Sequence, residues 1–323
     1  MMKKNINKYL VNSDLKFKAL MLITIVIWFA ISLIIIIIIL YRGASVFSYD
    51  FFFNFPSSDI KTFGVFPSII GTLITTIISI AVFFPIGVFS GYFISDYIKN
   101  YKIQKLILNF FYLAASVPTV IYGLFGFGFF VLTFGKTLDK ILETGVIFGQ
   151  PIILWASIAI GMISLPTTII SSFTLFSRTD AEKKEIIYSL GGSKSDVFFY
   201  AMFSELKKDL ISLGLLSFSR SIGETAPILY LGAAYYLPNL PIVDLNLYFF
   251  SIPIANPFDQ FMHLGYQIFT LTVQAPDQKA FEDITFGIAA ILIGFIIIIN
   301  LISNFFYLKY FKKFNYENYK DIF

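Results

Sequence analysis

Arg220 and Glu224 lie four residues apart inside a long apolar segment, where charged side chains are costly. A charge at the centre of a membrane helix costs about 2.5–3.5 kcal/mol on insertion scales, so such residues face the protein interior or a pathway. On a helix, positions four apart share a face, which allows this cation and this carboxylate to pair. Pro227 should bend the helix at the carbonyl of Gly223, beside Glu224. We therefore assign a pathway or gate to Arg220, Glu224, Thr225 and Pro227.

The Arg–Glu spacing fits two roles. Glu224 could hold Arg220 while the site is empty and release it when an anion arrives, which describes a gate. A permanent buried pair that ties this helix to a neighbour would explain the same spacing. The residues leave both interpretations open.

Composition predicts a membrane protein that spans the bilayer several times. The chain has 323 residues, of which 57% are hydrophobic and 14% charged, whereas soluble domains have about 25% charged residues. It has no cysteine and one histidine, His263, so a disulfide framework, a thiolate metal site and a paired-histidine zinc site are excluded. We interpret His263 as a polar residue at the membrane interface.

The expected fold is all-α, with six membrane-spanning helices. Stretches of about 20 apolar residues are long enough to span, and we place them at 19–41, 66–95, 105–134, 152–176, 211–237 and 285–308. The basic leader 1–18 precedes the first span, which we expect to be uncleaved because it is long and lacks a small-residue cleavage site. The chain then divides into 1–18, 19–65, a core at 66–308 and a tail at 309–323.

Basic residues predict the orientation. With both termini and the loops 96–105 and 177–210 on one side, that side holds 18 Lys and Arg residues and the opposite side holds five. The positive-inside rule makes the richer side cytoplasmic. The longest polar stretch, 177–210, is too short for a soluble domain. No phosphate-cradling G-x-x-x-x-G-K-[ST] motif is present, so any ATP would be bound by a partner chain.

The cytoplasmic loop 177–210 should form two helices. Thr179 and Glu182 read as a capping box, and the following helix carries its apolar residues on one face. These apolar residues are Ile186, Ile187 and Leu190, and Gly191 and Gly192 follow them as a left-handed stop. Ser193 and Asp196 read as the cap of a second helix that continues towards the fifth span.

Other polar and flexible residues lie within the spans. Pro85, Pro118 and Pro166 each free one backbone carbonyl, which neighbours or water must satisfy. Hydroxyls that could help are those of Thr72, Thr75, Thr76, Ser116, Thr119, Tyr122, Thr167 and Thr168. Gly123, Gly126 and Gly128 read as sites of close helix packing. The outer segment 238–284, rich in Pro and aromatic residues, could lie along the membrane interface.

Several of these blocks resemble the PstA family, the permeases of bacterial phosphate ABC importers. S-R-S-I-G-E-T-A-P-I-L-Y, Ser219–Tyr230, resembles the family's fifth-helix signature. Pro67–Thr72 with Pro85–Val88 resembles its second span, and Ser116–Gly126 its third. The loop resembles the "EAA" loop of ABC importer permeases, with Glu185 and Gly191 at the matching positions. It departs from that pattern at Ile186, Ile187, Ala201, Phe203 and Ser204.

The resemblance implies a permease subunit that forms half of a phosphate pathway in the bacterial inner membrane. It implies that Glu185, Ile186, Ile187, Leu190 and Gly191 contact the ATPase subunit. The other implied partners are a second, PstC-like permease and an extracytoplasmic phosphate-binding protein. No cofactor, metal, nucleic acid or enzymatic activity is expected for this chain itself.

Three alternatives stay open. The chain could be the PstC-like partner of the same system, although the A-P after G-E-T favours PstA. It could carry another oxyanion, such as sulfate, molybdate or phosphonate, because one Arg recognises charge and not shape. The remote alternative is an intramembrane enzyme that uses Glu224 as an acid or base.

Overall fold

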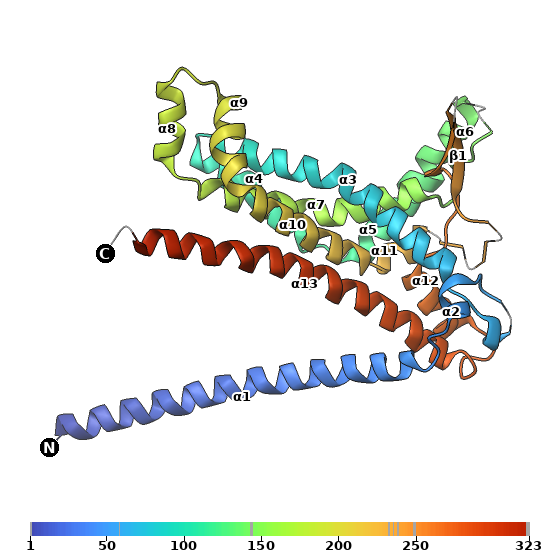
Figure 1. Cartoon of the computed structure of the whole chain (residues 1–323), viewed down its shortest axis with the longest axis horizontal. Coiled ribbons are helices and arrows are strands. Elements are labelled where there is room, and N and C mark those ends of the chain that lie inside the picture. The colour runs from blue at the N-terminus through green and yellow to red at the C-terminus, as the bar shows by residue number, and fades with distance from the viewer. Residues whose placement is uncertain are drawn as a thin grey trace.

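The protein is an all-α polytopic membrane protein with one small β-hairpin (Figure 1). The computed structural model describes residues 2–57, 59–142, 145–231, 233–234, 236–237, 239–247 and 250–320. Parts of the basic leader, the outer segment and the tail (residues 1, 238, 248–249 and 321–323) therefore lie outside the described residues.

The elements follow the chain in this order: α1 (Met2–Ala44), α2 (Tyr49–Phe53), η1 (Ile60–Thr62), α3 (Phe66–Asp96), α4 (Tyr101–Ala115), α5 (Thr119–Gly126), η2 (Phe127–Gly135), α6 (Lys136–Leu142), α7 (Ile153–Ser177), α8 (Ala181–Ser189), α9 (Lys194–Asp196), η3 (Val197–Phe203), α10 (Ser204–Ile222), α11 (Ala226–Leu231), β1 (Ile242–Leu247), β2 (Phe250–Ala255), α12 (Leu264–Phe269), η4 (Thr270–Gln274) and α13 (Glu282–Lys320).

Five helices among the described residues are long and apolar enough to cross a membrane. They cover Phe17–Ala44, Phe66–Asp96, Thr119–Leu142, Ile153–Ser177 and Glu282–Phe305. Four of the six predicted spans are therefore confirmed within a few residues, and two are wrong as drawn.

The predicted third span, 105–134, is two helices. α4 ends at Ala115, and α5 starts at Thr119 with Pro118 as its N-cap. Pro118 is thus not inside a span, because the residue before a proline avoids the helical region and the helix ends there. The apolar run that crosses continues from α5 through η2 and α6. Pro85 and Pro166 do lie inside α3 and α7, as predicted.

The predicted fifth span, 211–237, is also divided. α10 stops at Ile222 and α11 starts at Ala226. Pro227 has no N–H to donate to the carbonyl of Gly223, and its ring clashes with that carbonyl. The predicted bend at Gly223 is therefore a complete break of the helix.

The centre of the bundle is the pair α3 and α7, which contact each other along their length. Small residues make this close approach possible. A Cβ added at Gly87 would lie 2.6 Å from the side chain of Thr168, and one at Gly91 would lie 2.6 Å from Cβ of Ser172. The helices α10, α5 and α11 pack around this pair.

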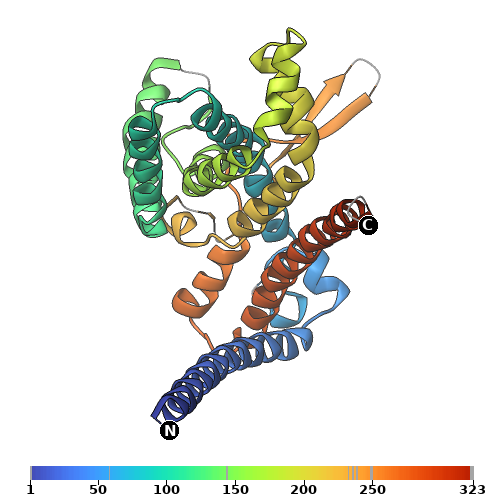
Figure 2. The ribbon, with the colours of Figure 1, turned by 90° about the vertical axis from the view of Figure 1, so that its left-hand side faces the viewer.

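The helix α1 stands apart from this core (Figures 1 and 2). None of the residues in the most apolar part of its membrane span is buried. Its C-terminal end is held against α13, where Arg42 pairs with Glu282 at 2.7 Å and with Asp283 at 2.8 Å. The guanidinium also lies 4.2 Å above the ring of Phe286.

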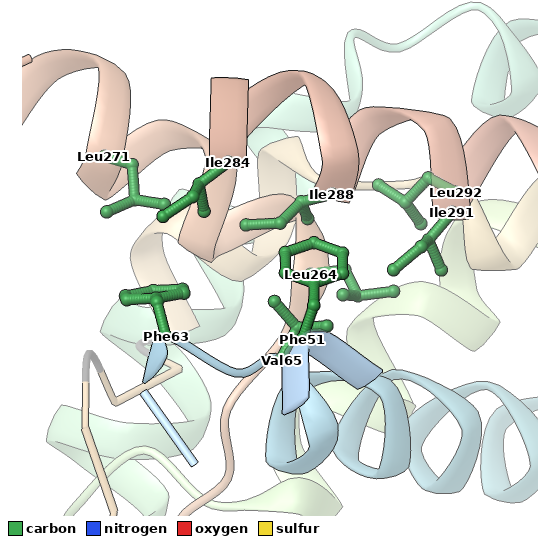
Figure 3. Packing of buried hydrophobic residues seen from close by; sticks show 9 residues of the cluster. All are labelled: Phe51, Phe63, Val65, Leu264, Leu271, Ile284, Ile288, Ile291 and Leu292. Atoms are coloured by element: carbon green, nitrogen blue, oxygen red, sulfur yellow. The ribbon is translucent and has the colours of Figure 1, made fainter. Parts of the chain in front are cut away.

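A separate hydrophobic cluster joins this end of the bundle to the segment between the last spans (Figure 3). Phe51, Phe63 and Val65 meet Leu264, Leu271 and the first turns of α13 in it. The prediction that the outer segment lies along the interface as one amphipathic stretch is therefore wrong. This segment forms the β1–β2 hairpin and then returns into the protein as α12 and η4.

Candidate functional site

The site lies where the helix breaks between α10 and α11. The amides of Gly223 and Glu224 donate to the carbonyls of Arg220 and Ser221, at 3.1 and 3.2 Å, which closes α10 with tight turns. The chain is then non-helical through Thr225, whose carbonyl accepts from Leu229 at 3.3 Å and so begins α11. Non-helical backbone at membrane depth is tolerated where it is buried in protein or lines a polar path.

Arg220 and Glu224 meet at this break. Nε of Arg220 lies 3.7 Å from Oε1 of Glu224, so the two side chains come together as the four-residue spacing suggested. Their environments differ, because the side chain of Arg220 is 44% exposed and that of Glu224 is 17% exposed. This chain alone therefore encloses the carboxylate much more than the guanidinium.

Pro227 holds the second position of α11, where its missing N–H is not needed for the helix. It also sets the packing against α5. A Cβ added at Gly123 would lie 2.6 Å from Cα of Pro227, so only glycine allows this contact. A Cβ added at Gly126 would lie 3.2 Å from Cδ1 of Leu231. The prediction for Gly128 is wrong, because nothing lies within 4 Å of a Cβ built there.

A short segment from the outer region covers Thr225. We call Phe261–Phe269 the plug segment; its residues from Phe261 to Gly265 are all buried. A Cβ added at Gly265 would collide with Cγ2 of Thr225, and one at Gly71 would collide with the carbonyl oxygen of Met262. Two glycines thus let the plug segment sit directly on α3 and on the helix break.

His263 belongs to the plug segment, so our placement of it at the membrane interface is wrong. It is 0% exposed, and its Nδ1 accepts a hydrogen bond from the amide of Gly265 at 3.1 Å. Removal from water lowers the pKa of His263 to about 3, which keeps the ring neutral. His263 lies outside the five helices that are long enough to span.

The candidate hydroxyls mostly serve the helices that carry them. Thr75, Thr76, Thr167 and Thr168 donate to carbonyls one turn earlier, and Ser116 donates to Leu113. For Thr119 the structure gives no hydrogen bond of its hydroxyl. Two others connect separate elements. Tyr122 donates to the carbonyl of Ala114, in the last turn of α4, at 2.9 Å. Thr72 accepts from the amide of Leu264 at 3.0 Å and so holds the plug segment.

The predicted loop at 177–210 forms the expected two helices at the opposite end of the bundle (Figure 1). The predicted Thr179–Glu182 cap is wrong, since Asp180 is the N-cap and accepts from the amide of Glu182 at 3.1 Å. The Ser193–Asp196 capping box is confirmed. Its hydrogen bonds from Ser193 lower the pKa of Asp196.

The apolar residues of α8 do not share one face. Ile187 packs against the buried cluster beneath the loop, whereas Ile186 is 53% exposed and Leu190 is 83% exposed. Glu185 is exposed as well, and Gly191 has the predicted left-handed conformation, with φ of +82°. The outer face of α8 is therefore an apolar surface with a carboxylate on the same helix.

Two contacts that no local sequence pattern predicts attach this loop to the spans. Nζ of Lys184 lies 2.6 Å from Oδ1 of Asp96, the last residue of α3. The hydroxyl of Tyr92 donates to the carbonyl of Lys194 at 3.1 Å. The loop is thus attached directly to α3. A lysine in a loop and an aspartate at a distant helix end carry no local pattern that would have paired them.

No family model matches this chain. Curated relatives include the phosphate transport system permease protein PstA homolog of Mycoplasma pneumoniae, which is 28% identical over 59% of this chain and 28% of its own length. PstC of Haemophilus influenzae is 25% identical over 66% of this chain and 73% of its own. The probable ABC transporter permease YqgI of Bacillus subtilis is 23% identical over 85% and 88%. The chain is thus similar to permeases of phosphate ABC transport systems, although it aligns with less than a third of the Mycoplasma protein.

Proposed function

We propose that the chain is a permease subunit of an ATP-driven importer for inorganic phosphate, and that it forms half of the translocation pathway. The observation that carries this proposal is the Arg220–Glu224 pair at the helix break. It places a partly exposed guanidinium, beside a neutralising carboxylate, at the break between α10 and α11. Similarity to permeases named for phosphate transport supports the cargo.

The exposure of Arg220 supports a second permease chain. A guanidinium in a membrane is stable only when it faces protein or water, and this chain leaves 44% of the side chain open. A partner permease would close that side and complete the path. Names of both kinds, PstA and PstC, occur among the relatives. We favour the PstA-like role because of the A-P that follows G-E-T.

The exposed face of α8 supports coupling to an ATPase subunit. Ile186, Leu190 and Glu185 are available to a partner, while Ile187 and Lys184 face the bundle. Binding on this face would move α3 through the Lys184–Asp96 ion pair. ATP would be bound and hydrolysed by the partner, so this subunit would not itself be an enzyme.

The proposed location is the bacterial cell membrane, with both termini and α8 in the cytoplasm. The Lys and Arg distribution supports that orientation. It places the β1–β2 hairpin and the plug segment on the outer side, where a phosphate-binding protein would deliver its cargo.

The test uses liposomes that contain this chain, a PstC-like permease and the ATPase subunit. ATP hydrolysis is measured after addition of binding protein loaded with phosphate, sulfate or molybdate. We expect stimulation by phosphate alone. Stimulation only by another oxyanion would keep the importer and refute the cargo. An intact complex that responds to none of the three would refute the importer.

A further inference from the structure

Three polar atoms of the plug segment are buried without a partner. Nε2 of His263 and both Nε2 and Oε1 of Gln267 make no hydrogen bond to the described part of the chain. His263 is 0% exposed and Gln267 is 2% exposed. At least about nine in ten buried polar groups in proteins are paired, because an unpaired one loses its hydrogen bonds to water without replacement. Seven hydroxyls elsewhere in the described part of the chain are also buried without a partner, but these three atoms lie together on one helical turn.

The two side chains offer N–H donors without a positive charge. Because Nδ1 of His263 accepts from Gly265, the neutral ring carries its proton on Nε2. The Gln267 carboxamide adds an NH₂ group. These residues are four apart, and the amide of Gln267 donates to the carbonyl of His263 at 2.9 Å, so they begin and end the first turn of α12. Neutral donors suit an anion in transit, because a site on a conduction path must bind weakly enough to release.

Their position is next to the helix break. Gly265 touches Thr225, the residue after Glu224, and a Cβ built at Gly265 would lie 3.4 Å from Nδ1 of His263. Gly265 therefore lies between the imidazole of His263 and Thr225, and Thr225 directly follows Glu224 of the Arg220–Glu224 pair. The plug segment lies at the end of the bundle opposite α8 (Figure 1), which is the outer end in the proposed orientation.

We propose that the plug segment is an outer gate over the break between α10 and α11, and that His263 and Gln267 are the donors that receive the anion when it opens. This inference rests on the proposed function. In the closed state the donors have no partner, which raises the free energy of that state. In the open state water or the oxyanion binds them, so opening recovers part of the cost.

Other contacts keep the gate closed at rest. The amide of Leu264 donates to Thr72, and the amide of Ala234 donates to the carbonyl of Phe261 at 2.7 Å. Leu264 belongs to the hydrophobic cluster of Figure 3, and Phe261 is buried in a second cluster with Ile228 of α11. Movement of α11 would therefore pull directly on the plug segment.

The first test measures access to the gate. The chain has no cysteine, so Gln267→Cys introduces a unique thiol for a membrane-impermeant maleimide. We expect slow labelling at rest and labelling at least about tenfold faster during ATP turnover with loaded binding protein, because a buried thiol reacts only through an open state. The control is Ala159→Cys, which is 1% exposed on α7 and outside the plug segment; its labelling should stay slow. Unchanged Gln267→Cys labelling in a complex that hydrolyses ATP would overturn the gate.

The second test separates a donor role from a structural one. Gln267→Met keeps the size of the side chain and removes its polar atoms, a change that is neutral or stabilising when those atoms are unpaired. We expect phosphate uptake to fall about tenfold, the effect of one good hydrogen bond of roughly 1.4 kcal/mol, with no loss of thermal stability. Exposed Gln274→Met should leave uptake unchanged. Normal uptake by Gln267→Met, or reduced uptake together with reduced stability, would overturn the proposal.

Failure of the gate and failure of the proposed function are distinguishable. The parent complex is first tested with each oxyanion. If it responds to sulfate or molybdate in place of phosphate, the cargo is wrong, and the same labelling and uptake tests with that oxyanion still decide the gate.

Discussion

Arg220 and Glu224 show what residue spacing predicts and what it misses. Their four-residue separation and their cost in a membrane were enough to predict a pair, and the structure places them 3.7 Å apart. The spacing argument assumed a continuous helix, yet Glu224 lies beyond its end. The unequal exposure of the two side chains depends on the neighbouring elements, so local sequence could not predict it.

The charge swap Arg220→Glu with Glu224→Arg tests whether the direction of the pair matters. The swap keeps an ion pair, so the protein should fold. It places a carboxylate at the more exposed position, which should repel an incoming anion, and we expect uptake to fall at least about tenfold, the rate equivalent of roughly 1.4 kcal/mol. Uptake is measured in proteoliposomes.

The matched control swaps Arg42 and Glu282, which join α1 to α13 away from the helix break, and adds Asp283→Asn so that the new carboxylate at position 42 meets no like charge; it should transport normally. If the Arg220–Glu224 swap also transported normally, the pair would be a structural tie, the alternative that the sequence left open.

His263 predicts the pH dependence of stability. The folded pKa is lowered to about 3, whereas the unfolded value is about 6.5. Below about pH 6.5 the unfolded state therefore binds a proton that the folded state does not, so stability is present above that pH and is lost as the pH falls towards 3. From pH 7 to 5 the loss should be about 2 kcal/mol.

The measurement is the thermal unfolding midpoint in detergent at several pH values. His263→Asn keeps an acceptor for the Gly265 amide without a titrating ring, and its midpoint should depend less on pH. Because the chain has one histidine, an equal pH dependence in both proteins would show that His263 is not its source.

At the scale of elements, helix existence was predictable and helix continuity was not. Long apolar runs at 66–95, 152–176 and 285–308 matched α3, α7 and α13 because nothing interrupts them strongly. Pro85 and Pro166 stay inside helices while Pro118 and Pro227 stand at helix starts. A proline pattern alone does not distinguish these outcomes, since packing against neighbours decides whether a freed carbonyl can be satisfied.

The plug segment was the largest error at this scale. Its aromatic and polar composition suggested an interface, but its fit depends on glycines in two distant elements, Gly71 and Gly265. Such contacts arise only when α3, α11 and α12 are brought together, so no local periodicity indicates them.

Gly71→Ala tests the docking of this segment. The added methyl group would collide with the backbone carbonyl of Met262, which cannot move away as a flexible side chain could. We expect a loss of stability of about 1–3 kcal/mol, seen as a lower unfolding midpoint in detergent. Gly128→Ala meets nothing within 4 Å and should leave the midpoint unchanged or slightly higher. Equal midpoints for the two variants would mean that the plug segment does not rest on α3.

At the scale of the whole molecule, the two ends of the bundle have different roles. One end carries the plug segment and the hairpin, and the other carries α8 (Figure 1). α3 runs between them, holding Leu264 through Thr72 and the loop through Asp96. A single helix thus connects the proposed gate to the proposed ATPase contact.

Leu190→Asp tests that contact. Leu190 is 83% exposed, so the change should not affect folding, yet it places a charge in the apolar surface that an ATPase subunit would cover. We expect the ATPase subunit to co-purify at least about tenfold less, the equivalent of roughly 1.4 kcal/mol of binding free energy. The control Ile141→Asp changes another exposed apolar residue, which lies in α6 and is 69% exposed, and the ATPase subunit should co-purify with it normally. Normal co-purification of Leu190→Asp would place the ATPase contact elsewhere.

The isolation of α1 has a consequence for biosynthesis. The ion pair that attaches it to α13 joins residues 240 positions apart, so it cannot form until the start of α13 has left the ribosome. Until then α1 must stay in lipid without that support. Its hydroxyls allow this, because Thr24 and Ser32 donate to carbonyls of their own helix at 2.9 Å. α1 is thus able to remain in the bilayer until α13 has been made.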